Sequence, residues 1–403
     1  MKFNLTVLSP IHIGNGNQIS NWSYSYDERN KKIKIYNFEE VVKSLKDNVQ
    51  RLINLTSLIE RHPLEKSLGE VISSYGITVK PLYQIEFKGD IKRKNGNEYK
   101  PIYEFIKESG KVYIPGSEIK GAIRTALFYK ILKDKFLESP AIKNKFLEDY
   151  KECVNVSNYR DERERRANIK KNFSNFIKRW ESIAFRAGFS KVFDREFKQE
   201  DAKKDILKLL LVSDSDLKDP QECLEVQDIK SLGVSRGFRE LHELLKVGTK
   251  FTIDLEVSFK EEYKELLPET YGYLDLELKK IKEACSEFAN AILNEDIHYI
   301  ENIKNTNIKN TNEINDKEKE SILNKLKKRR ELVEKGFFVL RLGKHQGFLS
   351  TTINLLVKEL APEVYSEVYP NLVNKGYKDK PNKSRKITYD NEFMGWCVLI
   401  KAE

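Results

Sequence analysis

The stretch YIPGSEIKGAIRTALFYKIL, from Tyr113 to Leu132, joins a strand-like start to a helix through a Pro-Gly-Ser turn. Ile119, Ile123 and Leu127 recur at helical spacing and predict one buried helix face. The hydroxyl of Ser117 is expected to cap the helix. Because the first amides of a helix have no partner within it, this start suits an anionic ligand.

Lys120 and Arg124 lie four residues apart and are predicted to share the opposite, exposed face of this helix. Gly121 stands between them, where alanine would be the better helix former. A missing side chain lets a ribose or a phosphate backbone pass close to the helix, or it admits a tightly packed neighbour. The first alternative predicts a phosphate-rich ligand across the first turn.

The rest of the chain indicates an α+β protein in which strands and helices alternate. Period-two alternation or short apolar runs indicate strands, at 2–8, 33–36, 206–217 (a central strand), 224–234, 246–259 and 391–400. Apolar residues at three- and four-residue steps indicate helices, at 38–58, 278–299 and 317–335. A hairpin is expected over 81–106, with its turn at Asn95-Gly96-Asn97. Two ferredoxin-like (RRM-like) domains with helical insertions are predicted.

The expected domain boundary lies near residue 240. The predicted N-terminal domain, 1–240, contains a highly charged helical insertion at about 133–206. The predicted C-terminal domain, 241–403, contains an Asn/Lys-rich segment at about 301–316 that is interpreted as a mobile loop.

Composition favours a polyanionic partner and excludes several classes of protein. The 403 residues carry a formal net charge of +10, which favours association with nucleic acid. The four cysteines show no CxxC or Cys/His spacing, so neither a disulfide framework nor a zinc knuckle is predicted. No secretion signal or apolar run of membrane-spanning length is recognised, and a soluble cytoplasmic protein without a membrane partner is expected.

Two further glycine loops carry candidate binding residues. In SPIHIGNGN (9–17), Gly14 and Gly16 expose backbone amides next to His12. In RLGKHQGFLSTT (341–352), two glycines enclose a basic Lys-His pair. This loop lacks the GxxxxGK[ST] pattern, so a Walker nucleotide site is not predicted.

No catalytic arrangement is recognised in the sequence. His12 has no second histidine or tyrosine fixed beside it by spacing. Asp214 and Asp216, in VSDSDL, resemble a metal pair, but such a run more often ends a strand and starts a turn. The sequence therefore predicts a binding protein without a cofactor, a catalytic residue or a metal ligand.

Taken together, LTVLSPIHIGNGN, YIPGSEIKGAIRTALFY, LRLGKHQGFLSTT and the final GWCVLI resemble the RAMP superfamily of CRISPR-associated RNA-binding proteins, in particular a subunit of type III-A (Csm) effector complexes. The resemblance implies a non-catalytic subunit that caps the backbone filament and binds the 3′ part of the CRISPR RNA (crRNA). It also implies a contribution to crRNA maturation, through recruited host nucleases, and to antiviral defence. The implied partners are crRNA and the other Csm subunits, both backbone and small.

The resemblance places the glycine loops at the RNA backbone. The expected RNA-binding residues are His12, Gly14, Gly16, Ser117, Lys120, Gly121, Arg124, Arg341, Gly343, Lys344, His345 and Gly347. Amides and cations would hold phosphates, and aromatic rings would stack on unpaired bases. The double variant Lys120→Glu with Arg124→Glu is expected to abolish RNA retention and leave the fold intact.

Two alternatives remain open at this stage. One is a RAMP endoribonuclease that processes precursor crRNA without metal and depends on His12. The other is a subunit that only joins proteins together, whose basic surface serves solubility.

Overall fold

The computed structural model describes residues 1–93, 96–155, 161–232, 239–258, 269–303, 315–351, 353–373 and 385–402. Most of the loop predicted to be mobile, residues 304–314, lies outside the described residues. The strands are β1 (Lys2–Val7), β2 (Gly14–Ile19), β3 (Tyr24–Asp27), β4 (Lys32–Ile35), β5 (Tyr83–Lys88), β6 (Ile102–Phe105), β7 (Lys107–Glu108), β8 (Lys111–Val112), β9 (Leu210–Val212), β10 (Leu224–Leu232), β11 (Arg239–Leu245), β12 (Lys250–Val257), β13 (Phe338–Arg341), β14 (Arg385–Ile387) and β15 (Trp396–Lys401). The α-helices are α1 (Phe38–Ser44), α2 (Val49–Arg61), α3 (Leu68–Tyr75), α4 (Gly116–Glu138), α5 (Pro140–Glu152), α6 (Glu162–Ser182), α7 (Pro220–Cys223), α8 (Lys279–Glu301), α9 (Asp316–Glu334), α10 (Asn354–Leu360) and α11 (Pro362–Val373).

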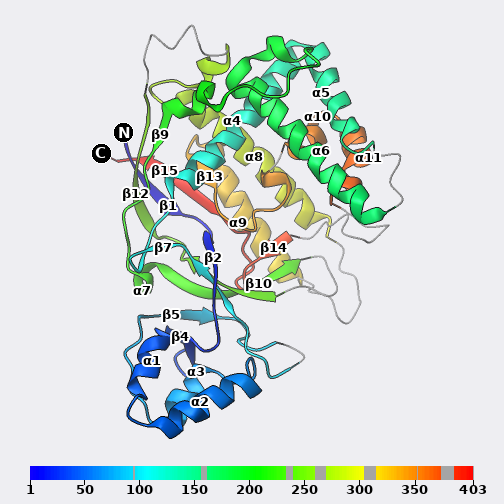
Figure 1. Ribbon diagram of the computed structural model, residues 1–403. Coiled ribbons are helices and arrows are strands. Elements are labelled where there is room, and N and C mark those ends of the chain that lie inside the picture. The colour runs from blue at the N-terminus through cyan, green and yellow to red at the C-terminus, as the bar shows by residue number, and fades with distance from the viewer. Residues whose placement is uncertain are drawn as a thin grey trace.

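The first sheet has the strand order β13-β15-β1-β12-β9, and every neighbouring pair is antiparallel. The run β1-α4-β9-β12-α8-β15 has the connectivity of a ferredoxin-like fold, and β13 extends its edge. Buried Leu5 lies between Phe251 on β12 and Leu399 on β15. The two chain ends are therefore adjacent in one sheet (Figure 1).

The second sheet has the order β2-β6-β11-β10-β5-β4-β3, with β14 also paired to β10. It is mixed, because β10 runs parallel to β5 and β11 runs parallel to β6. The predicted hairpin over 81–106 is wrong: β5 and β6 are both strands, but the β10–β11 pair lies between them. Asn95 of the predicted turn lies outside the described residues; beside it, an isolated bridge joins Lys92 and Tyr99, and the amide of Arg93 donates to the carbonyl oxygen of Glu98.

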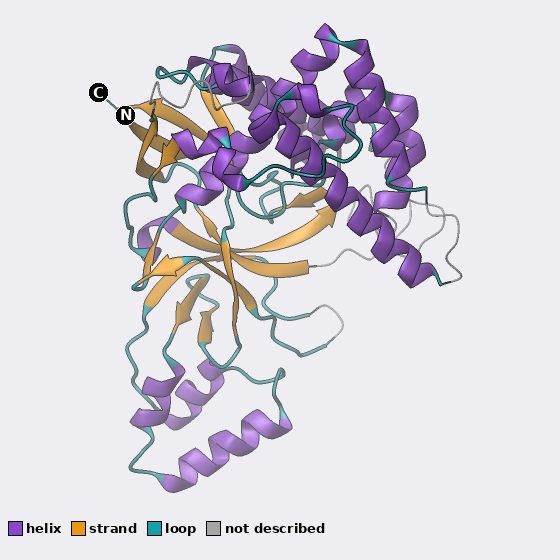
Figure 2. Ribbon diagram, turned by 45° about the horizontal axis from the view of Figure 1, so that its top comes forward, coloured by secondary structure: helices purple, strands orange, loops and turns teal. Residues whose placement is uncertain are grey.

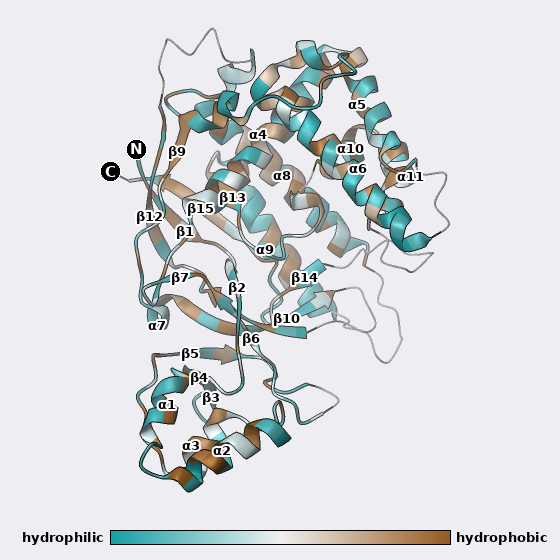
Figure 3. Cartoon of the chain, in the orientation of Figure 1, coloured by the Kyte–Doolittle hydropathy of each residue, from teal (hydrophilic) through white to brown (hydrophobic). Residues whose placement is uncertain are grey.

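The helices form two groups on either side of the strands (Figure 2). The larger group includes α4 and α8, which pack on the first sheet, while α1–α3 lie beyond the second sheet. The helices α1–α3 enclose a small core of their own, made by Trp22, Leu45, Leu55 and Val71. Apolar residues concentrate on the first sheet and on α8, whereas α6 is mostly hydrophilic (Figure 3).

These elements confirm the α+β class and most of the predicted strands and helices. The helix predicted over 38–58 is divided, because Asn48 caps the start of α2 through its side chain. The segment 206–217 forms only the short edge strand β9, and the residues before it, Ile206–Leu209, form a 3₁₀-helix.

Strands from both sides of residue 240 share the first sheet. The expected domain boundary there stays a prediction. Among the described helices, none combines the length and the apolar character needed to cross a bilayer.

Candidate functional site

His12 lies in the connection between β1 and β2 and is buried. Its Nδ1 donates to the carbonyl oxygen of Glu243 at 2.8 Å, so the other ring nitrogen, Nε2, carries a lone pair. Burial and the neighbouring His242 lower the pKa of His12 to about 3, which keeps the ring neutral. A Cβ at Gly14 would come within 2.8 Å of Nε2, so this glycine leaves room for the His12 ring.

In chain order, the first glycine loop is 9–17, the second is the start of α4 and the third is 341–352; the third packs directly on the first. The amide of Lys344 donates to the carbonyl oxygen of His12 at 2.8 Å. Gly343 has a φ of +77°, and a Cβ there would overlap the same carbonyl oxygen. Gly347 also has a positive φ, at +94°. These glycines are required by backbone conformation and by close approach.

The start of α4 differs from the prediction in its cap. The helix begins at Gly116, and Ser117 lies inside its first turn without capping it. The amide of Gly116 instead donates to Oδ1 of Asp214 at 2.7 Å. Asp214, which the sequence offered as one of a metal pair, therefore satisfies a helix-start amide from the segment after β9. A Cβ at Gly116 would overlap the carbonyl oxygens of Val212 and Ser213.

A groove of about 270 Å³ connects the start of α4 with the third loop. Ser117 and Gly121 line it from α4, and Gly343 and Gln346 line it from the loop. A Cβ at Gly121 would meet no atom within 4 Å. Gly121 therefore does not admit a packed neighbour from this chain, and it leaves the wall of the groove open.

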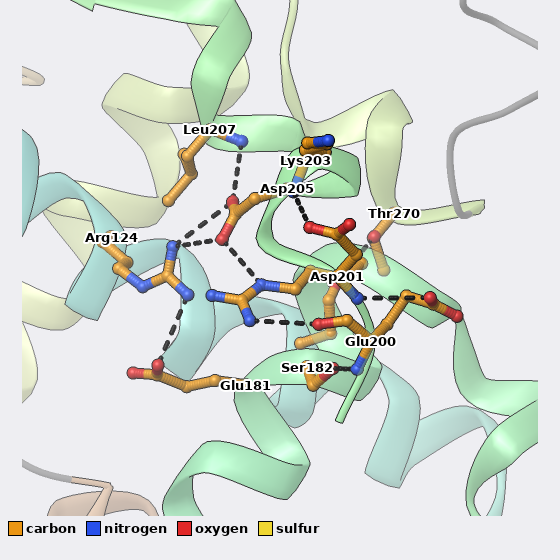
Figure 4. Close-up of polar contacts among 11 residues, drawn as sticks. Arg124, Glu181, Ser182, Glu200, Asp201, Lys203, Asp205, Leu207 and Thr270 are labelled. Atoms are coloured by element: carbon orange, nitrogen blue, oxygen red, sulfur yellow. Dashed lines mark hydrogen bonds and ion pairs between the residues drawn. The ribbon is translucent and has the colours of Figure 1, made fainter. Parts of the chain in front are cut away.

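Lys120 and Arg124 are directed into their own protein. Nζ of Lys120 donates to the carbonyl oxygen of Leu210 at 2.8 Å, and burial lowers its pKa. Arg124 donates to Asp205 at 3.0 Å and to Glu181 at 3.3 Å, as Figure 4 shows. Its guanidinium also lies 4.3 Å from the centre of the Phe185 ring.

The charge-reversed double variant would therefore bring two new carboxylates to internal sites. At position 124 the new carboxylate would lie beside Asp205 and Glu181. The expectation that this variant leaves the fold intact conflicts with these contacts, because like charges at short range destabilise a fold. RNA retention by this variant is consequently a poor test of RNA contact.

Arg341 is buried and bonded within the chain. Its NH1 donates to Asp296 at 2.8 Å and to Ser350 at 3.0 Å, while Nε donates to the carbonyl oxygen of Met394 at 2.9 Å. The guanidinium lies 5.0 Å from the centre of the Trp396 ring. These contacts fix the end of β13 and the start of the third loop.

Three residues beside the loops escaped the sequence analysis. Tyr103 on β6 stacks on His242 of β11, with ring centres 4.5 Å apart, and Nζ of Lys344 lies 4.5 Å from the Tyr103 ring centre. Glu240 lies two residues before His242 on the same strand. The signal available in the sequence was the scarcity of histidine: the chain has five, and three of them, His12, His242 and His345, gather here.

The buried carboxylate of Glu243 supports the first loop from inside the protein. Glu243 accepts hydrogen bonds from the Tyr83 hydroxyl at 2.7 Å, from the amide of Phe105 at 2.9 Å and from Nζ of Lys107 at 2.6 Å. Its own carbonyl oxygen holds His12. The position of the first loop therefore depends on a charged network that is fully bonded inside the protein.

The structure thus combines an α+β fold with a third glycine loop that contacts the first and faces the start of α4 across the groove. A model of the RAMP superfamily matches residues 4–358, and the chain belongs to this superfamily. The resemblance inferred from the sequence motifs is thus confirmed.

Within the superfamily, the similar curated proteins are Csm5 proteins. A stretch of 143 residues is 30% identical to the CRISPR system Cms protein Csm5 of Streptococcus thermophilus, over 31% of this chain and 37% of that protein. A stretch of 133 residues is 26% identical to the Csm5 of Methanocaldococcus jannaschii, over 32% of this chain and 30% of that protein. The chain thus spans about a third of the length of these curated relatives.

The fold resembles solved structures over nearly the whole chain. One is a chain of a cryo-EM structure of a Csm-crRNA-target RNA ternary complex in a type III-A CRISPR-Cas system, with a TM-score of 0.69, 24% identity, and coverage of 99% of this chain and 100% of that one. Another is the crystal structure of T. onnurineus Csm5, with a TM-score of 0.65, 24% identity, and coverage of 98% and 99%. At this identity the likeness concerns the fold.

Proposed function

We propose that the chain is a non-catalytic, RNA-binding subunit of a type III-A CRISPR-Cas effector complex. It caps the backbone filament and binds the 3′ part of the crRNA. The observation that carries the proposal is the meeting of three glycine loops that lie far apart in the sequence: the third loop contacts the first through the Lys344 amide and faces α4 across the groove. A Csm-crRNA-target RNA complex among the similar structures supports the same assignment.

The RNA would lie over a surface that we name the glycine surface: Gly14, Gly16, Ser117, Gly121, Gly343, Lys344 and Gly347. Side chains are absent or small along most of this surface, so a phosphate backbone can approach the chain closely. Gly16 and Gly121 have open space at their Cβ positions. The exposed Lys344 adds a cation beside the Tyr103 ring, on which a base can stack.

The other predicted RNA-binding residues would act by holding this surface in place. Lys120, Arg124 and Arg341 each donate hydrogen bonds to acceptors of the chain itself. His12 and His345 shape the first and third loops from inside. The proposal thus keeps all three predicted loops and assigns five of their residues to support.

Membership in such a complex implies further partners and a place in the cell. We propose the other Csm subunits as protein partners, a contribution to crRNA maturation through recruited host nucleases, and the cytoplasm as the site of action. The net charge of +10 is consistent with a subunit that associates with RNA.

A charge placed in the groove tests the RNA surface. Gly121→Glu adds a carboxylate where a Cβ meets no atom within 4 Å, so the fold should tolerate it. We expect the affinity of the purified chain for a single-stranded RNA with the sequence of the 3′ part of the crRNA to fall by about tenfold, with a weaker salt dependence, because a phosphate contact is lost. Filter binding across a series of salt concentrations measures both quantities.

Gln50→Glu is the matched control, because it adds the same charge at an exposed position on α2, in the helix group beyond the second sheet. Its RNA affinity should change much less than that of Gly121→Glu. Equal affinities for the wild-type chain and Gly121→Glu would show that RNA does not cross the start of α4.

The nuclease alternative conflicts with the surroundings of His12. The ring is 1% exposed, its Nδ1 is bonded to a backbone carbonyl, and its Nε2 faces Gly14. A general acid or base must reach the substrate within hydrogen-bond distance, and this ring is enclosed. Metal-independent cleavage of precursor crRNA that disappears in His12→Ala would reinstate this alternative. Effector complexes that assemble without any crosslink from this chain to RNA would favour a purely protein-joining subunit.

A further inference from the structure

Beside the glycine surface, three potential metal ligands converge: a carboxylate oxygen of Glu240, Nε2 of His242 and Nε2 of His345. These atoms all lie within 4.8 Å of one another. Nε2 of His242 is 3.3 Å from Nε2 of His345 and 3.4 Å from Oε2 of Glu240. The sequence analysis predicted no metal ligand here, because the three residues come from two distant segments.

The two separations from Nε2 of His242 are those of ligands around one tetrahedral ion. With Zn–N and Zn–O distances of about 2.0–2.2 Å and tetrahedral angles, two ligand atoms lie about 3.3–3.5 Å apart. Nε2 of His242 faces a carboxylate oxygen and a second imidazole nitrogen, and a neutral imidazole has one proton for its two nitrogens.

The backbone holds the three ligands in place. Glu240 and His242 are two residues apart on β11, so their side chains lie on the same face of the strand. His345 is held in the left-handed region, at φ +69°, between the two positive-φ glycines of the third loop. A non-glycine residue in this conformation is uncommon and points to a constraint on its side chain.

Neighbouring groups orient the ligands. The Tyr103 hydroxyl is hydrogen-bonded to Glu240, and its ring stacks on His242. The positive charges of Lys344 and Lys386 act on His345, and an anionic fourth ligand would offset their repulsion of a cation.

We propose that Glu240, His242 and His345 bind one divalent transition-metal ion, with Zn²⁺ as the expected occupant. Two imidazoles and a carboxylate suit Zn²⁺ better than Mg²⁺, which prefers oxygen ligands in octahedral geometry. The ion would tie the third glycine loop to β11. This site is independent of whether the glycine surface binds RNA.

The test is metal binding by the purified full-length chain after chelator treatment and removal of the chelator. We expect calorimetric titration to show that one equivalent of Zn²⁺ binds and that Mg²⁺ does not bind. With Co²⁺, the chain should show visible absorption with the intensity of a tetrahedral complex. Glu240→Gln preserves the shape of the side chain, and His345→Asn tolerates the left-handed backbone. Each should weaken Zn²⁺ binding by more than about tenfold, because the loss of a supporting outer-shell partner alone costs about 10–100-fold.

His62→Gln is the matched control, since His62 and Glu65 form an exposed His–Glu pair that lies 2.9 Å apart on the surface. This variant should bind Zn²⁺ like the wild-type chain. Circular dichroism verifies that each variant is folded. Failure of the folded wild-type chain to bind one equivalent, or unchanged Zn²⁺ affinity in both Glu240→Gln and His345→Asn, overturns the proposal.

Discussion

Two glycines five residues apart in α4 have opposite reasons to be glycine. At Gly116 a Cβ would overlap the carbonyl oxygens of Val212 and Ser213, so β9 can approach the helix only because the side chain is missing. At Gly121 the Cβ position is open. Among the residues that the structure describes, no atom blocks a side chain at Gly121, and we propose RNA as the reason for its absence.

This contrast predicts opposite effects of the same substitution. Gly121→Ala should stabilise the chain by up to about 1 kcal/mol, because alanine is the better helix former. Gly116→Ala should destabilise it by about 1–3 kcal/mol through overpacking. Urea unfolding followed by circular dichroism measures both free energies. A destabilised Gly121→Ala variant would mean that the groove wall is packed in solution.

At the scale of elements, α4 and α8 are joined by charges as well as by apolar packing. Glu287 on α8 pairs with Lys133 of α4 at 2.7 Å and with Lys130 at 3.1 Å. All three side chains are less than a third exposed. Burial by itself would raise the pKa of Glu287, but the hydrogen bonds from the two lysines outweigh it and lower the pKa below its ordinary value of 4.5.

The lowered pKa makes the stabilisation by Glu287 depend on pH. A carboxylate with a lowered folded-state pKa contributes stability fully above its ordinary value of 4.5, and the contribution disappears as the pH falls through the lowered value. Glu287→Gln should therefore lower the free energy of unfolding by about 1–2 kcal/mol at pH 7. The difference from the wild-type chain should shrink as the pH falls below 4.5, as urea unfolding at several pH values would reveal.

Glu334→Gln is the control for this pair, because Glu334 meets Arg330 at the surface of α9 with 58% of its side chain exposed. Glu334→Gln should change the free energy of unfolding by no more than about 0.5 kcal/mol at pH 7. A cost for Glu287→Gln that stays constant from pH 7 to acid would contradict the assignment of the stabilisation to charge.

At the scale of the whole molecule, the first sheet joins both ends of the chain. The strands β1 and β9 come from the first 240 residues, and β12, β13 and β15 come from the remainder. Because β1 lies between β15 and β12, removing it would split the sheet and expose buried strand faces.

This arrangement gives a test of the domain boundary predicted near residue 240. We expect fragments 1–240 and 241–403 to be insoluble or unfolded when expressed separately, and to form a soluble complex when expressed together. Size exclusion and circular dichroism provide the readout. Two separately folded fragments with cooperative unfolding transitions would instead establish the boundary as one between independent domains.

The sequence by itself determined the α+β class, most strands and helices, the three glycine loops and the superfamily. These features follow from local patterns of residues: alternation along a strand, three- and four-residue steps along a helix, and short motifs. For Asp214 and Asp216 the sequence favoured a strand end and a turn over a metal pair. The two residues lie in an irregular segment after β9 that is not a turn, and Asp214 accepts a hydrogen bond from the start of α4.

Only the tertiary structure decided which side chains are available for a ligand. Arg124 pairs with Asp205, which is 81 residues away in the sequence, and Arg341 pairs with Asp296, which is 45 residues away. His345 contacts His242 across a separation of 103 residues. Local spacing carries no information about such partners. Charged and polar groups that the fold brings together form hydrogen bonds and ion pairs with one another instead of facing solvent. The same reason separates β5 from β6: long-range pairing with β10 and β11 outweighs the local hairpin.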